Sequence, residues 1–157
     1  MSDYIELHAR SAFSFLRGAS APEYLAKAAA KLEIPALAIC DRDGVYGAPR
    51  LFGRAKEAGI RSIVGAELTM EDQAVLPVLV ESRRGYQNLC RLLTRAHLRA
   101  PKGEGAVRWD ELPEFAEGLV ALTGDLFQVP SSNLQAPNKF QIPIAGRCAR
   151  WKLKMKN

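Results

Sequence analysis

The sequence predicts an α/β fold with parallel strands, because strand-like and helix-like segments alternate over residues 4–123. Short apolar runs, such as residues 36–40 and 119–123, are typical of buried strands, and segments with helical spacing of apolar residues lie between them. A repeated strand–helix order favours right-handed crossovers in a sheet that is open or closed into a barrel. With 157 residues, 48% hydrophobic and 25% charged, the chain has the composition of a globular domain.

The first half of the chain supplies two predicted strands and one helix. Residues 4–8 (YIELH) alternate between apolar and polar and indicate a strand, which leads into an aromatic-containing loop. Ser20 and Glu23 have the spacing of a capping box, with Pro22 in the first turn of the helix that follows. The predicted buried stripe of that helix consists of Leu25, Ala28, Ala29 and Leu32. The apolar strand 36–40 then runs into Asp41-Arg42-Asp43-Gly44.

The second half continues the alternation. We expect a helix over residues 50–58 ending at Gly59, a strand over 60–66 followed by Glu67, and a strand over 76–80. Ser82 is positioned to cap a helix. Its predicted buried stripe consists of Tyr86, Leu89, Cys90 and Leu93. A loop over 99–107, a helix starting at 109–115 and a strand over 119–123 complete the pattern.

The positive charge of the chain is concentrated at its end. Residues 1–124 hold 16 Lys/Arg and 16 Asp/Glu, whereas residues 125–157 hold six bases and one acid, which accounts for the net charge of +5. We therefore interpret residues 1–124 as the folded domain and 125–157 as a basic tail that is disordered or foreign to the fold. A truncated or frame-shifted gene end and an unrelated extension are both open for this tail, and a divergent piece of the same fold is the alternative.

Composition also excludes several classes of protein. The longest apolar runs are far shorter than the roughly 20 residues that span a bilayer, so we expect no membrane association. The three cysteines, Cys40, Cys90 and Cys148, are widely spaced and form no CxxC pair. This pattern indicates neither a zinc site nor a disulfide framework, and it favours a cytoplasmic protein.

Charged residues that follow two of the strands are candidates for a site. In parallel α/β folds chemistry is located beyond the carboxyl ends of strands, which is where Asp41, Asp43 and Glu67 are expected. The simpler interpretation is that Asp41 and Asp43 cap the turn and the next helix, with Arg42 as their solvated partner. A separate basic face, formed by Arg83, Arg84, Arg91, Arg95 and Arg99, is interpreted as solvated, with contact to a phosphate backbone as the alternative.

Five segments, taken in order, resemble one protein family. They are ELHARSAFSFLRGAS (6–20), ALAICDRDGVYGAPR (36–50), IVGAEL (63–68), GYQNLCRLLTRA (85–96) and GLVALTG (118–124). They resemble the N-terminal polymerase-and-histidinol-phosphatase (PHP) domain of error-prone DNA polymerases, relatives of the bacterial DNA polymerase III α subunit. The resemblance implies a distorted β/α barrel with parallel strands, which is incomplete here, because a closed barrel typically needs about 250 residues. Residues 1–124 would be a partial PHP domain.

The resemblance also implies where a multi-metal centre would lie. His8 and Glu67 match two metal ligands of the family, whereas Arg10, Arg17 and Arg42 stand at positions of three others. A guanidinium has no lone pair to donate, so we expect His8 and Glu67 to be vestigial and the site to hold no metal. Zinc or manganese is expected only if the site is functional. The arginines are predicted to form ion pairs with Glu67, Asp41 and Asp43 instead.

The function implied by the resemblance is that of an N-terminal fragment of an error-prone polymerase, in DNA replication and translesion repair of damaged DNA. The polymerase site would lie outside this chain, so no catalytic residue is assigned and the chain alone is expected to be inactive. DNA and replication or repair proteins are the partners implied for the longer polymerase, and exposed strand edges predict self-association of the fragment. The alternatives are a small metal-dependent PHP phosphoesterase and a nucleic-acid-binding module.

Overall fold

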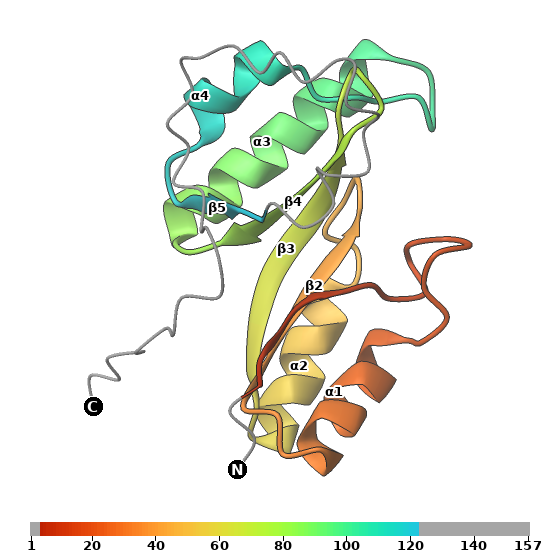
Figure 1. Ribbon diagram of the computed structural model, residues 1–157, viewed down its shortest axis with the longest axis vertical. Helices are drawn as coiled ribbons and strands as arrows, with labels where there is room; N and C mark the ends of the chain where they lie inside the picture. Colours follow the sequence, from red (N-terminus) through yellow and green to blue (C-terminus); the bar gives the residue numbers. More distant parts are fainter. Residues whose placement is uncertain (1–3, 123–157) are drawn as a thin grey trace.

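The computed structural model describes residues 4–122 as one mixed sheet with helices packed against it. Figure 1 shows the sheet running through the middle, with α1 and α2 along one end and α3 and α4 along the other. The strands are β1 (Glu6–Ala9), β2 (Ala36–Arg42), β3 (Arg61–Thr69), β4 (Val75–Val80) and β5 (Leu119–Ala121), adjacent in that order. The helices are α1 (Pro22–Lys31), α2 (Ala48–Ala58), α3 (Arg83–Arg99) and α4 (Leu112–Phe115), with a 3₁₀ turn, η1 (Trp109–Glu111), before α4.

The α/β class is confirmed, but the prediction of parallel strands is wrong for β4, which runs against its two neighbours. The β1–β2 and β2–β3 pairs are parallel, whereas β3–β4 and β4–β5 are antiparallel. The cause is the short connection after β3, where Met70 N–H donates to Ala74 O (2.8 Å) and Gln73 N–H to Met70 O (2.9 Å). A parallel crossover needs a dozen or more residues, so a turn of this length can only make a hairpin.

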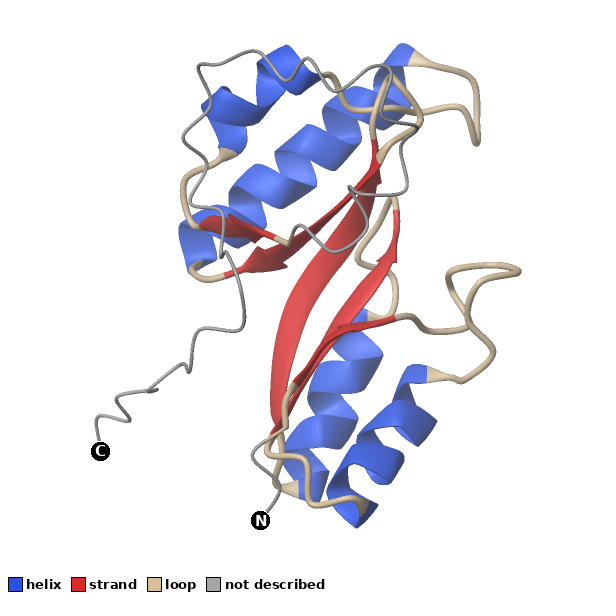
Figure 2. Ribbon diagram, in the orientation of Figure 1, coloured by secondary structure: helices blue, strands red, loops and turns tan. Residues whose placement is uncertain are grey.

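Strand register shows that the four helices share one face of the sheet. Ile39 lies opposite Val64, and Leu68 opposite Leu76, so these side chains point to the same side. Leu37 and Ile39 pack with α1 and α2, while Leu68 and Leu76 pack with α3 and α4. Ala38 and Cys40, one residue out of step, belong to a separate cluster on the opposite face. Figure 2 shows the twist that places the two helix pairs at different ends of this face.

Two predicted helix ends are confirmed, and one is corrected. Ser82 Oγ accepts the Gly85 N–H of α3 (3.1 Å), and Gly59 closes α2 in the left-handed region (φ 71°). The capping box predicted at Ser20 does not form, because the residue before α1 is Ala21 and makes no side-chain cap. In α1 the predicted stripe is only partly right, since Ala26 and Ala29 are buried while Leu32 is exposed.

The buried face of α3 is rotated about the helix axis relative to the predicted one. Leu89 and Leu93 are buried as expected, together with Leu92 and Ala96, whereas Tyr86 is exposed. The rotation is fixed by Gly85, which packs against the backbone of Gly118, where an added Cβ would lie 1.8 Å from the carbonyl oxygen. The predicted tail, 125–157, lies outside the described residues. No helix within residues 4–122 is long and apolar enough to cross a membrane.

Candidate functional site

The candidate site lies where the carboxyl ends of β1, β2 and β3 meet. Because these three strands are parallel, their ends converge at one edge of the sheet, together with the loop that leaves β1 (Figure 1). This edge collects the sequence-predicted residues His8, Arg10, Asp41, Arg42 and Glu67. Each of them takes its position from the period-two alternation of its strand.

Glu67 is the centre of a buried charge cluster. His8 Nε2 donates to Glu67 Oε1 at 2.6 Å, and Arg10 Nε forms an ion pair with the same oxygen. Burial raises the pKa of Glu67, but the hydrogen bonds from His8 and Arg10 outweigh it, so the pKa of this carboxyl lies below its ordinary value of 4.5. The other oxygen, Oε2, is buried and has no hydrogen-bond partner within the described residues. Glu67 is therefore an ionised carboxylate neutralised by side chains of β1 and the residue after it.

Asp41 lies on the opposite face from Glu67 and has a different set of partners. It is 1% exposed and accepts hydrogen bonds from the Ser11 N–H (2.9 Å), the Ser11 hydroxyl (2.8 Å), the Ser14 hydroxyl (2.8 Å) and the Gly47 N–H (3.1 Å). Gly47 precedes α2, so the simpler prediction, that Asp41 caps the turn and the next helix, agrees with this geometry. Asp41 thereby ties the β1–α1 loop (residues 10–21) to the start of α2.

Asp43 fixes the turn after β2 to β3. Its carboxylate accepts the Thr69 N–H and the Thr69 hydroxyl, both at 2.7 Å, and lies 3.4 Å from Arg42 Nε. Its backbone has φ 49°, a left-handed conformation that Asp tolerates better than most residues. His97 Nε2 donates to the Asp43 carbonyl oxygen at 2.7 Å, so α3 is also attached to this turn.

The three arginines at the ligand-equivalent positions have different environments. Arg10 pairs with Glu67 and Arg42 lies beside Asp43, as the sequence predicts. Arg17 is exposed and makes no ion pair within residues 4–122, so the predicted arginine partner for Asp41 is corrected to the two serines of the β1–α1 loop. The physical reason is that Asp41 and Arg42 are successive residues of β2 and point to opposite faces.

Sequence reasoning missed the serine and threonine partners. Ser11, Ser14 and Thr69 each lie 26 to 30 residues from the aspartate that they contact. The sequence signal for these partners was weak. It consisted of two serines three residues apart in the loop after a strand. Thr69 was missed because β3 extends to Thr69, whereas the predicted strand ended at residue 66.

The residues described at this edge do not fit a metal centre. His8 and Glu67 provide ligand atoms, but the described part of the chain contains no group of three or more His, Cys, Asp or Glu side chains able to hold a metal ion. The orphaned Glu67 Oε2 adds a single oxygen, next to the Arg10 guanidinium. Two ligands beside a fixed positive charge are too few for a divalent cation that prefers four to six.

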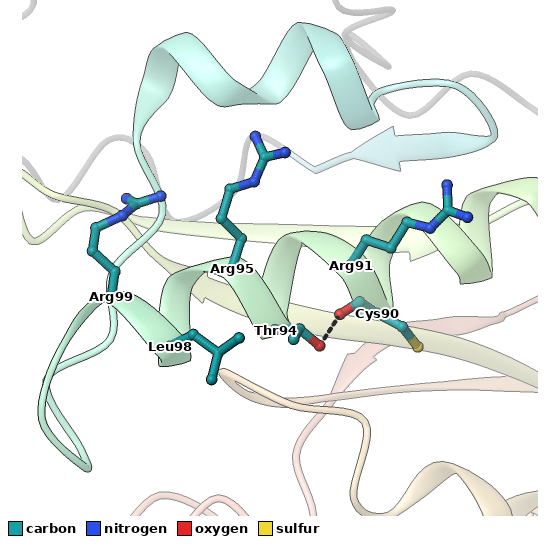
Figure 3. A pocket seen from close by; sticks show the side chains of 6 residues that line it. All are labelled: Cys90, Arg91, Thr94, Arg95, Leu98 and Arg99. Carbon is teal, nitrogen blue, oxygen red and sulfur yellow. Dashed lines mark hydrogen bonds between the residues drawn. The ribbon is translucent and has the colours of Figure 1, made fainter.

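The basic face of α3 is largely neutralised. Arg95 makes two hydrogen bonds to Glu114 (2.7 and 3.0 Å), and Arg99 pairs with Glu111. Figure 3 shows Arg95 and Arg99 lining a shallow groove of about 610 Å³. The groove is also lined by Cys90, Arg91, Thr94 and Leu98. Because Arg84, Arg95 and Arg99 are paired with neighbouring acids, this face is a poorer candidate for binding phosphates than its sequence indicates.

Comparison with known families agrees with this architecture. The model of the PHP domain family matches residues 6–141, most of the chain, and the chain therefore belongs to the PHP domain family. The matched range extends past Gly124, so the boundary proposed there stays a prediction.

Three curated relatives share a single name. The chain is 44% identical over 122 residues to the error-prone DNA polymerase of Pseudomonas fluorescens, covering 78% of this chain and 12% of the relative. It is 39% identical to that of Rhodopirellula baltica, covering 75% and 10%, and 43% identical to that of Pseudomonas aeruginosa, covering 78% and 12%. The chain thus spans about a tenth of the length of the curated relatives it matches.

Among solved structures, an amidohydrolase from Chromobacterium violaceum has a TM-score of 0.48 at 23% identity, covering 59% of this chain and 32% of the other. We draw nothing further from a likeness of this size.

Proposed function

We propose that this chain is the N-terminal PHP-domain portion of an error-prone DNA polymerase that acts in DNA replication and in translesion synthesis past damage. The observation that carries the proposal is the 39–46% identity to proteins of that name over 116–126 residues. Nucleotidyl transfer would then be performed by the remainder of a longer polymerase, whose partners are DNA and replication and repair proteins in the cytoplasm.

The role that we propose for the domain itself is that of a metal-free scaffold. In this role the Arg10 guanidinium replaces metal ions as the counter-charge of Glu67, and His8 donates a hydrogen bond to the same carboxylate. Asp41 and Asp43 hold the loops at the same edge. Arg10, Arg17 and Arg42 would occupy former ligand positions, and their positive charges would make a bound metal unnecessary. Neither phosphoester hydrolysis nor polymerisation is then expected from the chain alone.

A chimera tests the scaffold role. Residues 4–122 of this chain would replace the matching segment of the Pseudomonas aeruginosa relative, and primer extension past an abasic template site would be measured beside the parent. We expect extension by the chimera and its loss with Asp41→Ala, because Asp41 holds the β1–α1 loop in place. An inactive chimera that melts at the temperature of the parent would overturn the proposal.

Elemental analysis tests the absence of a metal. We expect less than one zinc or manganese per ten chains after dialysis, and no difference between the wild type and Glu67→Gln. A stoichiometric metal that is lost in Glu67→Gln would contradict the assignment of Glu67 as a partner of Arg10, and would favour the phosphoesterase alternative.

Self-association is a separate expectation. β1 and β5 are the outer strands of the described sheet, and each has one edge that is unpaired within it. We propose that copies of the chain associate through these edges. Sedimentation velocity at increasing protein concentration checks this, and a monomer at all concentrations would contradict it.

A further inference from the structure

The β1–α1 loop brings several large, exposed apolar side chains together in one turn. Phe15 is 82% exposed, Leu16 is 90% exposed and Phe13 is 41% exposed. Figure 2 shows this loop projecting beyond the helices next to the carboxyl ends of β1 and β2. Large apolar side chains gathered at one exposed turn are characteristic of an interaction site.

Backbone and side-chain hydrogen bonds hold the loop in place. Ser14 N–H donates to Ser11 O and Gly18 N–H to Ser14 O, both at 2.9 Å, and the two serine hydroxyls are bonded to buried Asp41. At Gly18 an added Cβ would lie 2.1 Å from Ser11 O, so the turn closes tightly on itself. Leu16 has φ 62°, a left-handed conformation that is unfavourable for a non-glycine residue. A strained turn held by buried hydrogen bonds is preorganised for binding.

The exposed surface around this loop is cationic, although acidic residues lie beneath it. Asp41 and Glu67 are almost completely buried, so their charges lie beneath the surface. The Arg42 side chain is 44% exposed against 21% for its partner Asp43, and Arg17 is exposed without an ion pair within residues 4–122. The guanidinium groups of Arg17 and Arg42 thus face solvent in front of the buried Asp41 and Glu67, whereas Arg50, 54% exposed, pairs with the 33% exposed Glu23. This layering complements an extended polyanion.

Aromatic rings and guanidinium groups alternate at this edge. The Arg50 guanidinium, which also pairs with Glu23, lies over the Phe13 ring, 5.6 Å from its centroid. Phe15 and Arg17 are two residues apart in the same turn. Aromatic faces flanked by cations bind single-stranded nucleic acid, because bases stack on the rings and phosphates pair with the guanidinium groups. A protein partner that bound these rings in an apolar pocket would not need the neighbouring arginines.

We propose that the β1–α1 loop, with Arg42 and Arg50, binds single-stranded nucleic acid, its phosphates on the arginines and its bases on Phe13 and Phe15. The choice of ligand rests on the proposed function, which places the chain in a DNA polymerase. The site is distinct from the α3 face, where Arg95 and Arg99 pair with Glu114 and Glu111.

Fluorescence anisotropy of the full 157-residue chain with a fluorescein-labelled oligothymidylate of about 20 nucleotides tests the proposal between about 50 and 200 mM NaCl. We expect Phe15→Ala to weaken binding about tenfold, through loss of one stacked base. Arg17→Ala should lower the slope of log affinity against log salt by about 0.7, the value for one phosphate of a single strand. The matched controls are Phe52→Ala, an exposed phenylalanine of α2, and Arg61→Ala, at the amino-terminal end of β3.

The four variants distinguish binding at this loop from binding elsewhere on the chain. Binding that is reduced by both loop variants and by neither control supports the proposal, provided that all four variants melt like the wild type. Binding that the loop variants do not change would place the nucleic acid elsewhere, and absence of binding at 50 mM NaCl would also overturn the inference. Loss of self-association in Phe15→Ala without DNA binding would instead identify a protein contact. An active chimera with no DNA binding by this loop would leave the proposed function intact and remove only this site.

Discussion

Replacing Asp41 by alanine tests whether the edge of the sheet depends on its buried carboxylate. The substitution removes the acceptor of two backbone N–H groups, those of Ser11 and Gly47, and of the hydroxyls of Ser11 and Ser14. The hydroxyls can rotate toward other acceptors, but the two N–H groups cannot. Each buried donor left without a partner costs about 1–3 kcal/mol, so we expect the free energy of unfolding to fall by about 2–6 kcal/mol. That is a large part of the roughly 5–15 kcal/mol that stabilises a typical domain.

Urea unfolding of the full chain, followed by the fluorescence of its two tryptophans, Trp109 and Trp151, and by circular dichroism, gives this free energy directly. Asp110→Ala is the matched control, because Asp110 is an exposed aspartate with no hydrogen bond or ion pair described within residues 4–122. If Asp41→Ala is too unstable to purify, Asp41→Asn keeps one acceptor oxygen and should show a smaller loss. A stability of Asp41→Ala within about 0.5 kcal/mol of the wild type, the range of neutral surface changes, would refute the reasoning.

Three further predictions follow from single contacts. Because the pKa of Glu67 is lower in the folded chain, its ionisation stabilises the fold above its ordinary value of 4.5, and this stability is lost as the pH falls through the folded pKa. Glu67→Gln should therefore unfold more easily near pH 7 and show a flatter loss in acid, as measured by urea midpoints against pH. Burial raises the pKa of Cys40 to about 12, so iodoacetamide should label Cys90 before Cys40 in the native chain; equal rates by peptide mass spectrometry would contradict this. Gly85→Ala should lower the melting temperature, because its Cβ would lie 1.8 Å from a backbone oxygen, whereas Gly53→Ala, with nothing within 4 Å, should raise it.

The sequence predicts where this site lies better than it predicts which side chains of the site contact one another. The resemblance places His8 and Glu67, 59 residues apart, in one site, and their side chains lie 2.6 Å from each other. The ion pair predicted between Asp41 and an arginine does not form within residues 4–122. The apolar run of β2 ends at Cys40, whereas the strand continues to Arg42. Once Asp41 and Arg42 are part of a strand, alternation sends them to opposite faces.

The reversed direction of β4 required a count of residues rather than a pattern. Apolar runs identify β4 and β5, but they carry no information on direction. The length of the connection does: only residues 70–74 separate β3 from β4, and no helical spacing occurs there. Contacts such as Ser14 to Asp41, which join a loop to a strand 27 residues later, depend on the packed fold and leave no local signal.

Arginine at the positions that the resemblance assigns to metal ligands would change which ions this edge of the sheet attracts. Glu67 is too deeply buried to remain ionised without a counter-charge, and Arg10 provides one that is covalently attached and always protonated. A divalent cation approaching Glu67 Oε2 would meet that guanidinium, at a cost of about 4 kcal/mol per unit charge at 4 Å and an effective dielectric constant of 20. The same arrangement lowers the free energy of an approaching phosphate, because Arg17 and Arg42 face solvent while the carboxylates lie behind them. An edge that repels divalent metals and attracts phosphates is suited to holding a nucleic-acid strand without cleaving it.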